Sequence, residues 1–187
     1  KYISILLSKV FFSFLYFDKM NFDESSGTVN CKTDWGEWYQ TVKEVVILVN
    51  VEPGTKSRDV EIKIKPKRIS CKVRGALLFE GIPYETVMED DSIWTIEENK
   101  LIRIALTKAE SRSKETSWLG LLKSIDGEEI LFKPDPYVYN EMRKKLDLEQ
   151  FQIENPGMNF SNAKLDKNYE DKYLKQAARA LEDNAPI

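Results

Sequence analysis

The amino-acid sequence predicts an all-β antiparallel sandwich of seven or eight strands, followed by a C-terminal α-helical extension. Between residues 35 and 123, short segments alternate apolar with polar residues, and turn residues recur roughly every 8–12 positions. No stretch of helical periodicity separates these segments, which disfavours a parallel α/β sheet. Beyond residue 135 the apolar residues recur at helical spacing instead.

The segment Val45–Val51 is the strand around which we expect the sandwich to assemble. Its odd-numbered residues are apolar throughout, and Val46 and Leu48 make the other face apolar at the start of the strand. Such a strand needs cover from another layer. Pro53 and Gly54 end it, because proline fixes φ and glycine accepts positive φ.

The following strands are expected in sequence order on the same criterion. We place them at 60–65, 69–74, 77–79, 84–88, 93–97 and 101–107. Gly81 is expected to break the run that precedes 84–88, and Glu89–Ser92 to form a solvated polar turn rather than a metal site. Cys71 falls on the apolar face of its strand, as expected for a small buried hydrophobic residue.

Aromatic residues flank these strands at both ends. Trp35–Thr41 is expected to pack its aromatic residues at the start of a sheet, and the apolar segment Trp118–Leu122 to dock across the sandwich. We interpret the four tryptophans as core and docking residues rather than as a ligand cage. Ile125–Ile130 is expected to form a turn or a small hairpin.

Three helices are predicted in the last third of the chain. The first begins at Asp135–Pro136, an N-cap followed by proline at the first helical position. The second begins at Asp147, with Gln150 completing a capping-box pattern, and ends at 155–157. The third covers Tyr169–Asp183, whose thin apolar stripe suits either self-association or packing onto the sandwich.

These elements define the expected domain organisation. We place an apolar upstream extension at 1–19, an N-terminal arm at 20–34, the sandwich at 35–123, a linker at 124–134 and the helical extension at 135–187. Met20 is interpreted as the biological start; an anchor or targeting leader is the alternative for 1–19, although this stretch is short for a membrane span.

Composition excludes several functional classes. The chain has no histidine, which removes the usual general base near neutral pH and the commonest zinc ligand. Serine triads and Cys–His dyads are therefore excluded, whereas carboxylate, lysine or tyrosine chemistry stays open. Because no site motif accompanies such residues, an enzyme is disfavoured, and we expect no metal or other cofactor. The net charge of −3 gives no overall attraction to nucleic acid or anionic membranes. Two cysteines without a metal-binding pattern favour a reduced intracellular protein.

Charge is strongly segregated along the sequence. Residues 56–74 contain eight basic and two acidic residues, whereas residues 80–98 contain seven acidic residues and no basic one. The basic residues are interpreted either as a solvated face that discourages edge pairing or as a surface that steers an acidic partner. Nucleic acid is disfavoured, because 56–74 has no aromatic residue for base stacking.

Several motifs in order resemble the NudC-like family of CS-domain proteins. They are Trp38–Thr41, Val51–Thr55, Trp94–Ile96, Leu101–Lys108, Trp118 and the tail segment Lys145–Ala163. The resemblance extends from about Met20 to about Tyr169. Residues 1–19 have no counterpart, 124–134 is longer than in the family, and the chain beyond Tyr169 departs from the family pattern.

The resemblance implies a sandwich like that of small heat-shock proteins and a non-enzymatic co-chaperone or scaffold. The implied partners are a heat shock protein 90 class chaperone and a lissencephaly-type β-propeller protein, in dynein regulation. The expected location is the cytoplasm, with association with the cytoskeleton as a further option. An ATP-independent holdase that captures unfolded clients is the alternative. The oligomeric state stays open.

Two sets of residues are candidates for partner binding. The first set is basic and comprises Lys63, Lys65, Lys67, Arg68, Lys72 and Arg74. The second set is apolar, lies in the tail and comprises Leu148, Phe151 and Phe160. No catalytic or metal-binding residue is assigned.

Overall fold

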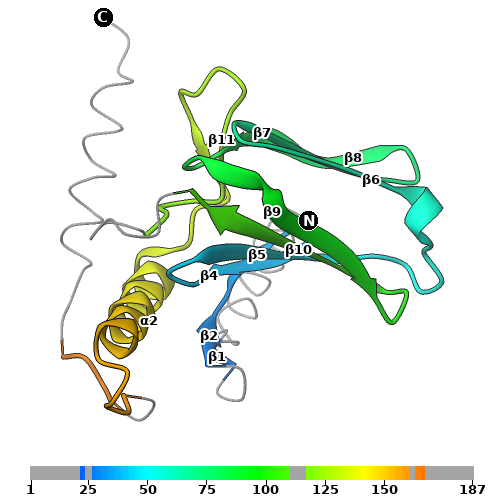
Figure 1. Ribbon diagram of the computed structural model, residues 1–187. Helices are drawn as coiled ribbons and strands as arrows, with labels where there is room; N and C mark the ends of the chain where they lie inside the picture. The colour runs from blue at the N-terminus through cyan, green and yellow to red at the C-terminus, as the bar shows by residue number, and fades with distance from the viewer. Residues whose placement is uncertain (1–21, 24–26, 110–116, 161–162, 167–187) are drawn as a thin grey trace, which may run out of the picture.

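Two five-stranded antiparallel sheets pack face to face, with one long helix beside them (Figure 1). This computed structural model describes residues 22–23, 27–109, 117–160 and 163–166. The first sheet has the order β3(Cys31–Thr33), β4(Gly36–Gln40), β5(Glu44–Asn50), β10(Leu101–Lys108) and β9(Val87–Glu97). The second has the order β12(Ile130–Leu131), β11(Leu122–Lys123), β8(Ala76–Pro83), β7(Arg68–Val73) and β6(Val60–Lys65).

Three smaller elements complete the described fold. β1(Phe22–Asp23) and β2(Thr28–Val29) form a two-stranded ribbon, and the 3₁₀ turn η2(Ser57–Asp59) precedes β6. The helix is α2(Pro136–Glu154). The predicted antiparallel sandwich is thus confirmed, with ten strands in its two sheets instead of the expected seven or eight. None of the helices described is long and apolar enough to cross a bilayer.

β5 is the central strand of the first sheet, as predicted. It pairs with β4 on one side and with β10 on the other, and Val45, Ile47 and Val49 are fully buried in the core. The facing residues Ile102, Ile104 and Leu106 of β10 are equally buried. The apolar face of β5 is therefore core and is not available to a partner.

The segment before β11 closes the sandwich. Trp118, Leu121 and Leu122 are almost completely buried in the core cluster, and β11 extends the second sheet alongside β8. This confirms the predicted docking of Trp118–Leu122. The hairpin predicted near Ile125–Ile130 also forms, as the antiparallel pair β11 and β12. The sheets thus reach beyond the expected limits of the sandwich, because β3 and β12 lie in the expected arm and linker.

Gly81 does not break a strand, contrary to our prediction. β8 runs through it to Pro83, and a Cβ at Gly81 would lie 2.6 Å from the carbonyl oxygen of Lys123 in β11. Such a distance is far below van der Waals contact. The glycine is needed for the close approach of a neighbouring strand, so it is a packing residue.

The polar turn predicted at Glu89–Ser92 is also wrong. These residues lie within the single long strand β9, at a β-bulge where the register against β10 shifts between Ala105 and Thr107. The Ser92 hydroxyl donates to the carbonyl of Met88 (2.6 Å) and accepts from the amide of Thr107 (3.1 Å). The side chain thereby satisfies backbone groups that the bulge would leave unpaired.

The first two predicted helices are one. The Asp135 carboxylate accepts from the amide of Val138 (2.9 Å), which confirms the predicted N-cap, but α2 then continues to Glu154 without interruption. Asp147 is no cap, because no helix-breaking residue precedes it and Met142 and Leu146 continue the buried face. The third predicted helix, Tyr169–Asp183, lies outside the described residues.

We predict that Gly81→Ala lowers the free energy of unfolding by about 1–3 kcal/mol, because the new methyl group must displace β11. Urea denaturation measures the effect. Gly157→Ala is the matched control, since a Cβ there would meet no atom within 4 Å. Equal stability of the two variants would contradict the packing role of Gly81.

Candidate partner-binding surfaces

The basic candidate residues lie on the β6–β7 hairpin, and we call the set Lys63, Lys65, Lys67, Arg68, Lys72 and Arg74 the basic hairpin face. β6 is an edge strand on which Lys63 and Lys65 are exposed while the alternate residues are half-buried. Lys72 of β7 lies directly opposite Glu61 in the strand register. An acidic residue therefore stands between Lys63 and Lys72.

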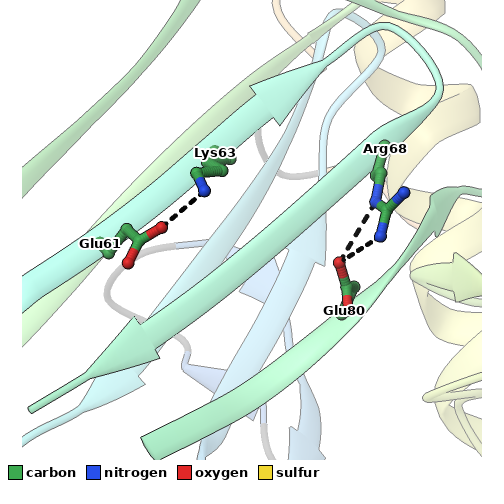
Figure 2. Close-up of polar contacts among 4 residues, drawn as sticks. All are labelled: Glu61, Lys63, Arg68 and Glu80. Carbon is green, nitrogen blue, oxygen red and sulfur yellow. Dashed lines mark hydrogen bonds and ion pairs between the residues drawn. The ribbon is translucent and has the colours of Figure 1, made fainter. Parts of the chain in front are cut away.

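Ion pairs cancel much of the positive charge on this face. The Lys63 ammonium lies 2.7 Å from the Glu61 carboxylate, and Arg68 donates two hydrogen bonds to Glu80, at 2.9 and 3.2 Å (Figure 2). The hydrogen bond from Lys63 lowers the pKa of the Glu61 carboxyl, and the same bond raises the pKa of Lys63. All four side chains lie near the surface, where such pairs are weak.

Two further pairs join the basic stretch to acidic residues elsewhere. Lys65 lies 2.5 Å from Glu89 of β9, and Arg74 is paired with Glu52. Neither Lys67 nor Lys72 lies within ion-pair distance of an acidic side chain in the described part of the chain. The pair of Lys65 with Glu89 joins the edge strands of the two sheets, and Glu52 lies in the loop after β5. The charge segregation of the sequence thus becomes alternation in space, because folding brings acidic residues beside basic ones.

The structure divides the basic hairpin face into two ends. Lys65, Lys67 and Arg68 gather at the β6–β7 turn, whereas Arg74 lies at the β7–β8 turn, where its φ is 50°. A six-residue strand separates the two turns, a length of roughly 20 Å. The face is therefore a stripe and not a single compact patch.

The apolar candidates lie at the C-terminal end of α2. Leu148 is half-buried and Phe151 is 44% exposed, and the Phe160 ring lies 6.3 Å from that of Phe151. Met158, which is 62% exposed, belongs to the same region. We call Leu148, Phe151, Ile153, Met158 and Phe160 the apolar end of α2.

One glutamine holds the chain after α2 against the helix. The Gln152 side chain donates to the carbonyl of Met158 (2.6 Å) and accepts from the amide of Phe160 (3.0 Å). The helix itself ends in a bond from the amide of Asn155 to the carbonyl of Phe151 (3.0 Å). The turn thus presents apolar side chains to solvent in a defined arrangement. Such exposed apolar groups are typical of interaction sites.

A buried polar network fixes α2 and the Trp118 segment to the first sheet. The Gln40 amide donates to the carbonyl of Trp118 (2.9 Å) and accepts from the Trp118 amide (2.9 Å). The same side chain also reaches the sulfur of Met142 in α2 (3.0 Å), and Glu149 accepts from the amide of Val42 (2.9 Å). Sequence reasoning missed this network, because Gln40 ends a strand that reads as ordinary polar alternation.

Lys108 completes the network and is only 3% exposed. Its ammonium donates to the Gln40 side chain (3.0 Å) and to the carbonyl of Thr41 (2.8 Å), and it lies 5.8 Å from the centre of the Trp118 ring. Burial lowers the pKa of Lys108 from 10.5 to about 7; the nearby Glu149 opposes this shift and Arg143 adds to it. The lysine thus has a structural position between sheet and helix.

The remaining reactive side chains suggest no chemistry of their own. Burial raises the pKa of the Cys71 thiol to about 11 and that of Cys31 to about 12, so neither is a ready thiolate at neutral pH. No three Cys, Asp or Glu side chains among the described residues are grouped to hold a metal ion. The hydrophobic position predicted for Cys71 is confirmed, since the residue is fully buried.

Comparison with known proteins decides the family. The family model of the CS domain matches residues 34–108. NudC domain-containing protein 2 of Homo sapiens is 40% identical over 148 residues, which are 79% of this chain and 90% of that protein. The chain belongs to the NudC family of CS-domain proteins. This confirms the resemblance seen in the sequence motifs.

Two further proteins are similar to this NudC-family chain. Protein BOBBER 2 of Arabidopsis thaliana is 32% identical over 154 residues, covering 68% of this chain and 53% of that protein. The crystal structure of NudC domain-containing protein 2 from Mus musculus is 39% identical, covering 74% of this chain and 100% of that one, with a TM-score of 0.40. CS domains and NudC proteins are protein-interaction modules, which supports protein partners for this NudC-family chain.

We predict that the free energy of unfolding rises between pH 7 and 8.5, because the unfolded chain keeps the Lys108 proton that the folded protein releases near pH 7. The rise is roughly 1–2 kcal/mol over this window. Lys108→Met removes the titrating group and should flatten the profile. The thiols of the unfolded chain, whose ordinary pKa is about 8.5, begin to ionise within this window and lower the stability of wild type and variant alike. The difference between the two profiles therefore isolates Lys108.

Urea denaturation at closely spaced pH values measures this slope. The slope, and not the absolute stability of the variant, is the readout, because methionine also removes two hydrogen bonds. A variant that keeps the wild-type slope would show that Lys108 does not titrate in this range.

Proposed function

We propose that this NudC-family protein is a non-enzymatic co-chaperone or scaffold that binds partner proteins in their native or near-native form. A ligand that binds only the folded form of a partner stabilises it by mass action. The proposed partners are a heat shock protein 90 class chaperone and a lissencephaly-type β-propeller protein, within dynein regulation in the cytoplasm. The family assignment supports this proposal.

The observation that carries the proposal is the apolar end of α2. Three of its side chains, Phe151, Ile153 and Met158, are each at least 44% exposed. Phe151 and Ile153 lie in the last turn of α2, and Met158 lies on the following turn, which Gln152 fastens to the helix. The helix is in turn fastened to the sheet through Met142 and Glu149. These side chains are already held in place in the free protein, so binding a partner costs little further conformational entropy. Such a surface is therefore suited to binding.

The basic hairpin face has a different proposed role. All of its side chains except the half-buried Lys72 are exposed, and four of the six are engaged in weak ion pairs, so they contribute little affinity of their own. Long-range attraction from such a face raises the association rate with an acidic surface. We therefore assign steering to the basic hairpin face and contact energy to the apolar end of α2.

An ATP-independent holdase is the second candidate function, and the same exposed apolar side chains favour it. An aggregation assay on a thermolabile client, without ATP or another chaperone, separates the two functions. Suppression at near-stoichiometric amounts supports the holdase. Absence of suppression, together with binding of a purified folded partner in titration calorimetry, supports the co-chaperone.

We predict that the double variant Phe151→Ser with Met158→Ser binds its folded partner about tenfold or more weakly, because exposed apolar anchors carry much of the energy of an interface. Titration calorimetry measures the dissociation constant. Tyr137→Ser is the matched control, since Tyr137 is 58% exposed at the other end of α2. Equal losses in both variants would contradict a specific role for the apolar end of α2.

We predict a different effect from charge reversal on the basic hairpin face. The test variant combines Lys63→Glu, Lys65→Glu, Lys72→Glu and Arg74→Glu. It should slow association roughly tenfold at low salt and much less at high salt, because steering is screened by ions. Stopped-flow mixing with the partner measures the rate.

The control for this variant reverses exposed lysines elsewhere on the first sheet and before α2. It combines Lys32→Glu, Lys43→Glu and Lys133→Glu. An association rate equally reduced in the control, or unchanged in the test variant, would reject steering by the basic hairpin face. Circular dichroism of both variants verifies that the sandwich is folded.

A further inference from the structure

A groove lies at the end of the sandwich where the connection from β5 to η2 crosses between the sheets, to the right in Figure 1. Its volume is about 230 Å³, and Val51, Val73 and Leu78 form its apolar floor. A cavity of about 150 Å³ holds a benzene molecule. The groove therefore has room for one aliphatic side chain of a partner.

The floor of the groove is formed by aliphatic side chains. Val51, Val73 and Leu78 are half-buried and pack against the main core. Thr55 also lines the groove and is fully buried, but its hydroxyl already donates to the carbonyl of Glu52 (2.6 Å). Nothing on the floor therefore competes with an apolar occupant.

The walls are held by backbone hydrogen bonds to two neighbouring segments. The amide of Val51 donates to the carbonyl of Lys100 (3.0 Å), and the amide of Gly54 donates to that of Asn99 (2.9 Å). On the other side, the amide of Arg74 donates to the carbonyl of Asp59 (2.6 Å). A groove framed in this way exists before binding, which lowers the cost of ordering it.

The rim carries an exchangeable ion pair. Arg74 donates to the Glu52 carboxylate through one guanidinium nitrogen, and the two side chains are 48% and 77% exposed. An arginine can hold a carboxylate through two parallel hydrogen bonds. Because an exposed pair is weakly held, an incoming carboxylate can replace or join Glu52 at small cost.

The surroundings of the groove are basic on balance. Residues 51–59, 72–78 and 97–100, which line or hold the groove, contain five basic side chains and four acidic ones. Of the acidic ones, Glu98 is paired with Lys100. Asp59 is already engaged, since its carboxylate accepts from the amide of Lys56 (3.0 Å). Lys56 and Arg58 are exposed beside the groove. Charge complementarity thus favours an acidic occupant.

We infer that this groove docks an acidic segment of a partner protein, with an aliphatic side chain on the floor and a neighbouring carboxylate on Arg74. The inference rests on the proposed function and deepens it, because it assigns a chemical class of ligand to one end of the basic hairpin face. The connection from β5 to η2, which lines the groove, lies at the opposite end of the sandwich from α2 in Figure 1.

A fluorescein-labelled blocked peptide, Glu-Glu-Leu-Glu-Glu, tests the inference against the full-length protein by fluorescence anisotropy. Arg74→Asn should weaken binding about tenfold, because a hydrogen-bonded charge is lost. Asparagine tolerates the positive φ of this position. Glu52→Gln should strengthen binding about threefold, because it removes the competing carboxylate.

Two controls separate docking from general attraction. Lys67→Asn makes the same charge change at the β6–β7 turn and should alter the affinity less than twofold. Replacing leucine by serine in the peptide should abolish specific binding. Equal effects of Arg74→Asn and Lys67→Asn, weaker binding to Glu52→Gln, or indifference to the leucine would each overturn the inference.

The outcome is separable from that of the proposed function. If the peptide fails to bind while the folded partner still binds through the apolar end of α2, the groove inference fails and the co-chaperone proposal stands. If Arg74→Asn does not fold, the direction of the Glu52→Gln effect still decides, since Glu52 is an exposed loop residue.

Discussion

The side-chain amide of Gln40 joins three parts of the fold that are distant in the sequence. It pairs with both peptide groups of Trp118, as a neighbouring strand would, and it also contacts Lys108 and Met142. Buried amides are costly unless they are fully hydrogen-bonded. Position 40 therefore decides whether the closing segment and α2 can lie against the first sheet together.

The orientation of the candidate surfaces follows from this contact. α2 packs beside the first sheet, with Met142 and Leu146 buried. About one turn after Leu146, the Glu149 carboxylate accepts a hydrogen bond from the amide of Val42. Its C-terminal end is thereby held at a fixed position relative to the sandwich. Apolar side chains on a loose tail would collapse onto any nearby surface, whereas these stay exposed because Gln152 and the helix hold them.

The sequence predicted those elements that are determined by residues close together in the chain. The alternation along Val45–Val51 predicts a buried central strand, and Asp135 before a proline predicts a helix start, since one face or one hydrogen bond decides each. Features set by distant neighbours were missed. Gly81 was predicted to break a strand because β11, which needs the close approach, is distant in the sequence. The burial of Lys108 was not predicted, because it depends on Gln40 and on the Trp118 segment.

The arrangement of charge is also set by residues that are distant in the sequence, and this arrangement affects function. A run of basic residues is followed in the sequence by a run of acidic ones, but Lys65 pairs with Glu89 of the other sheet and Arg68 pairs with Glu80 on the neighbouring strand. Exposed pairs of this kind contribute about 1 kcal/mol or less, so a partner can exchange them at little cost. The exposed charges of this protein are thus suited to raising the association rate and orienting a partner. The binding free energy must then come mainly from apolar contacts.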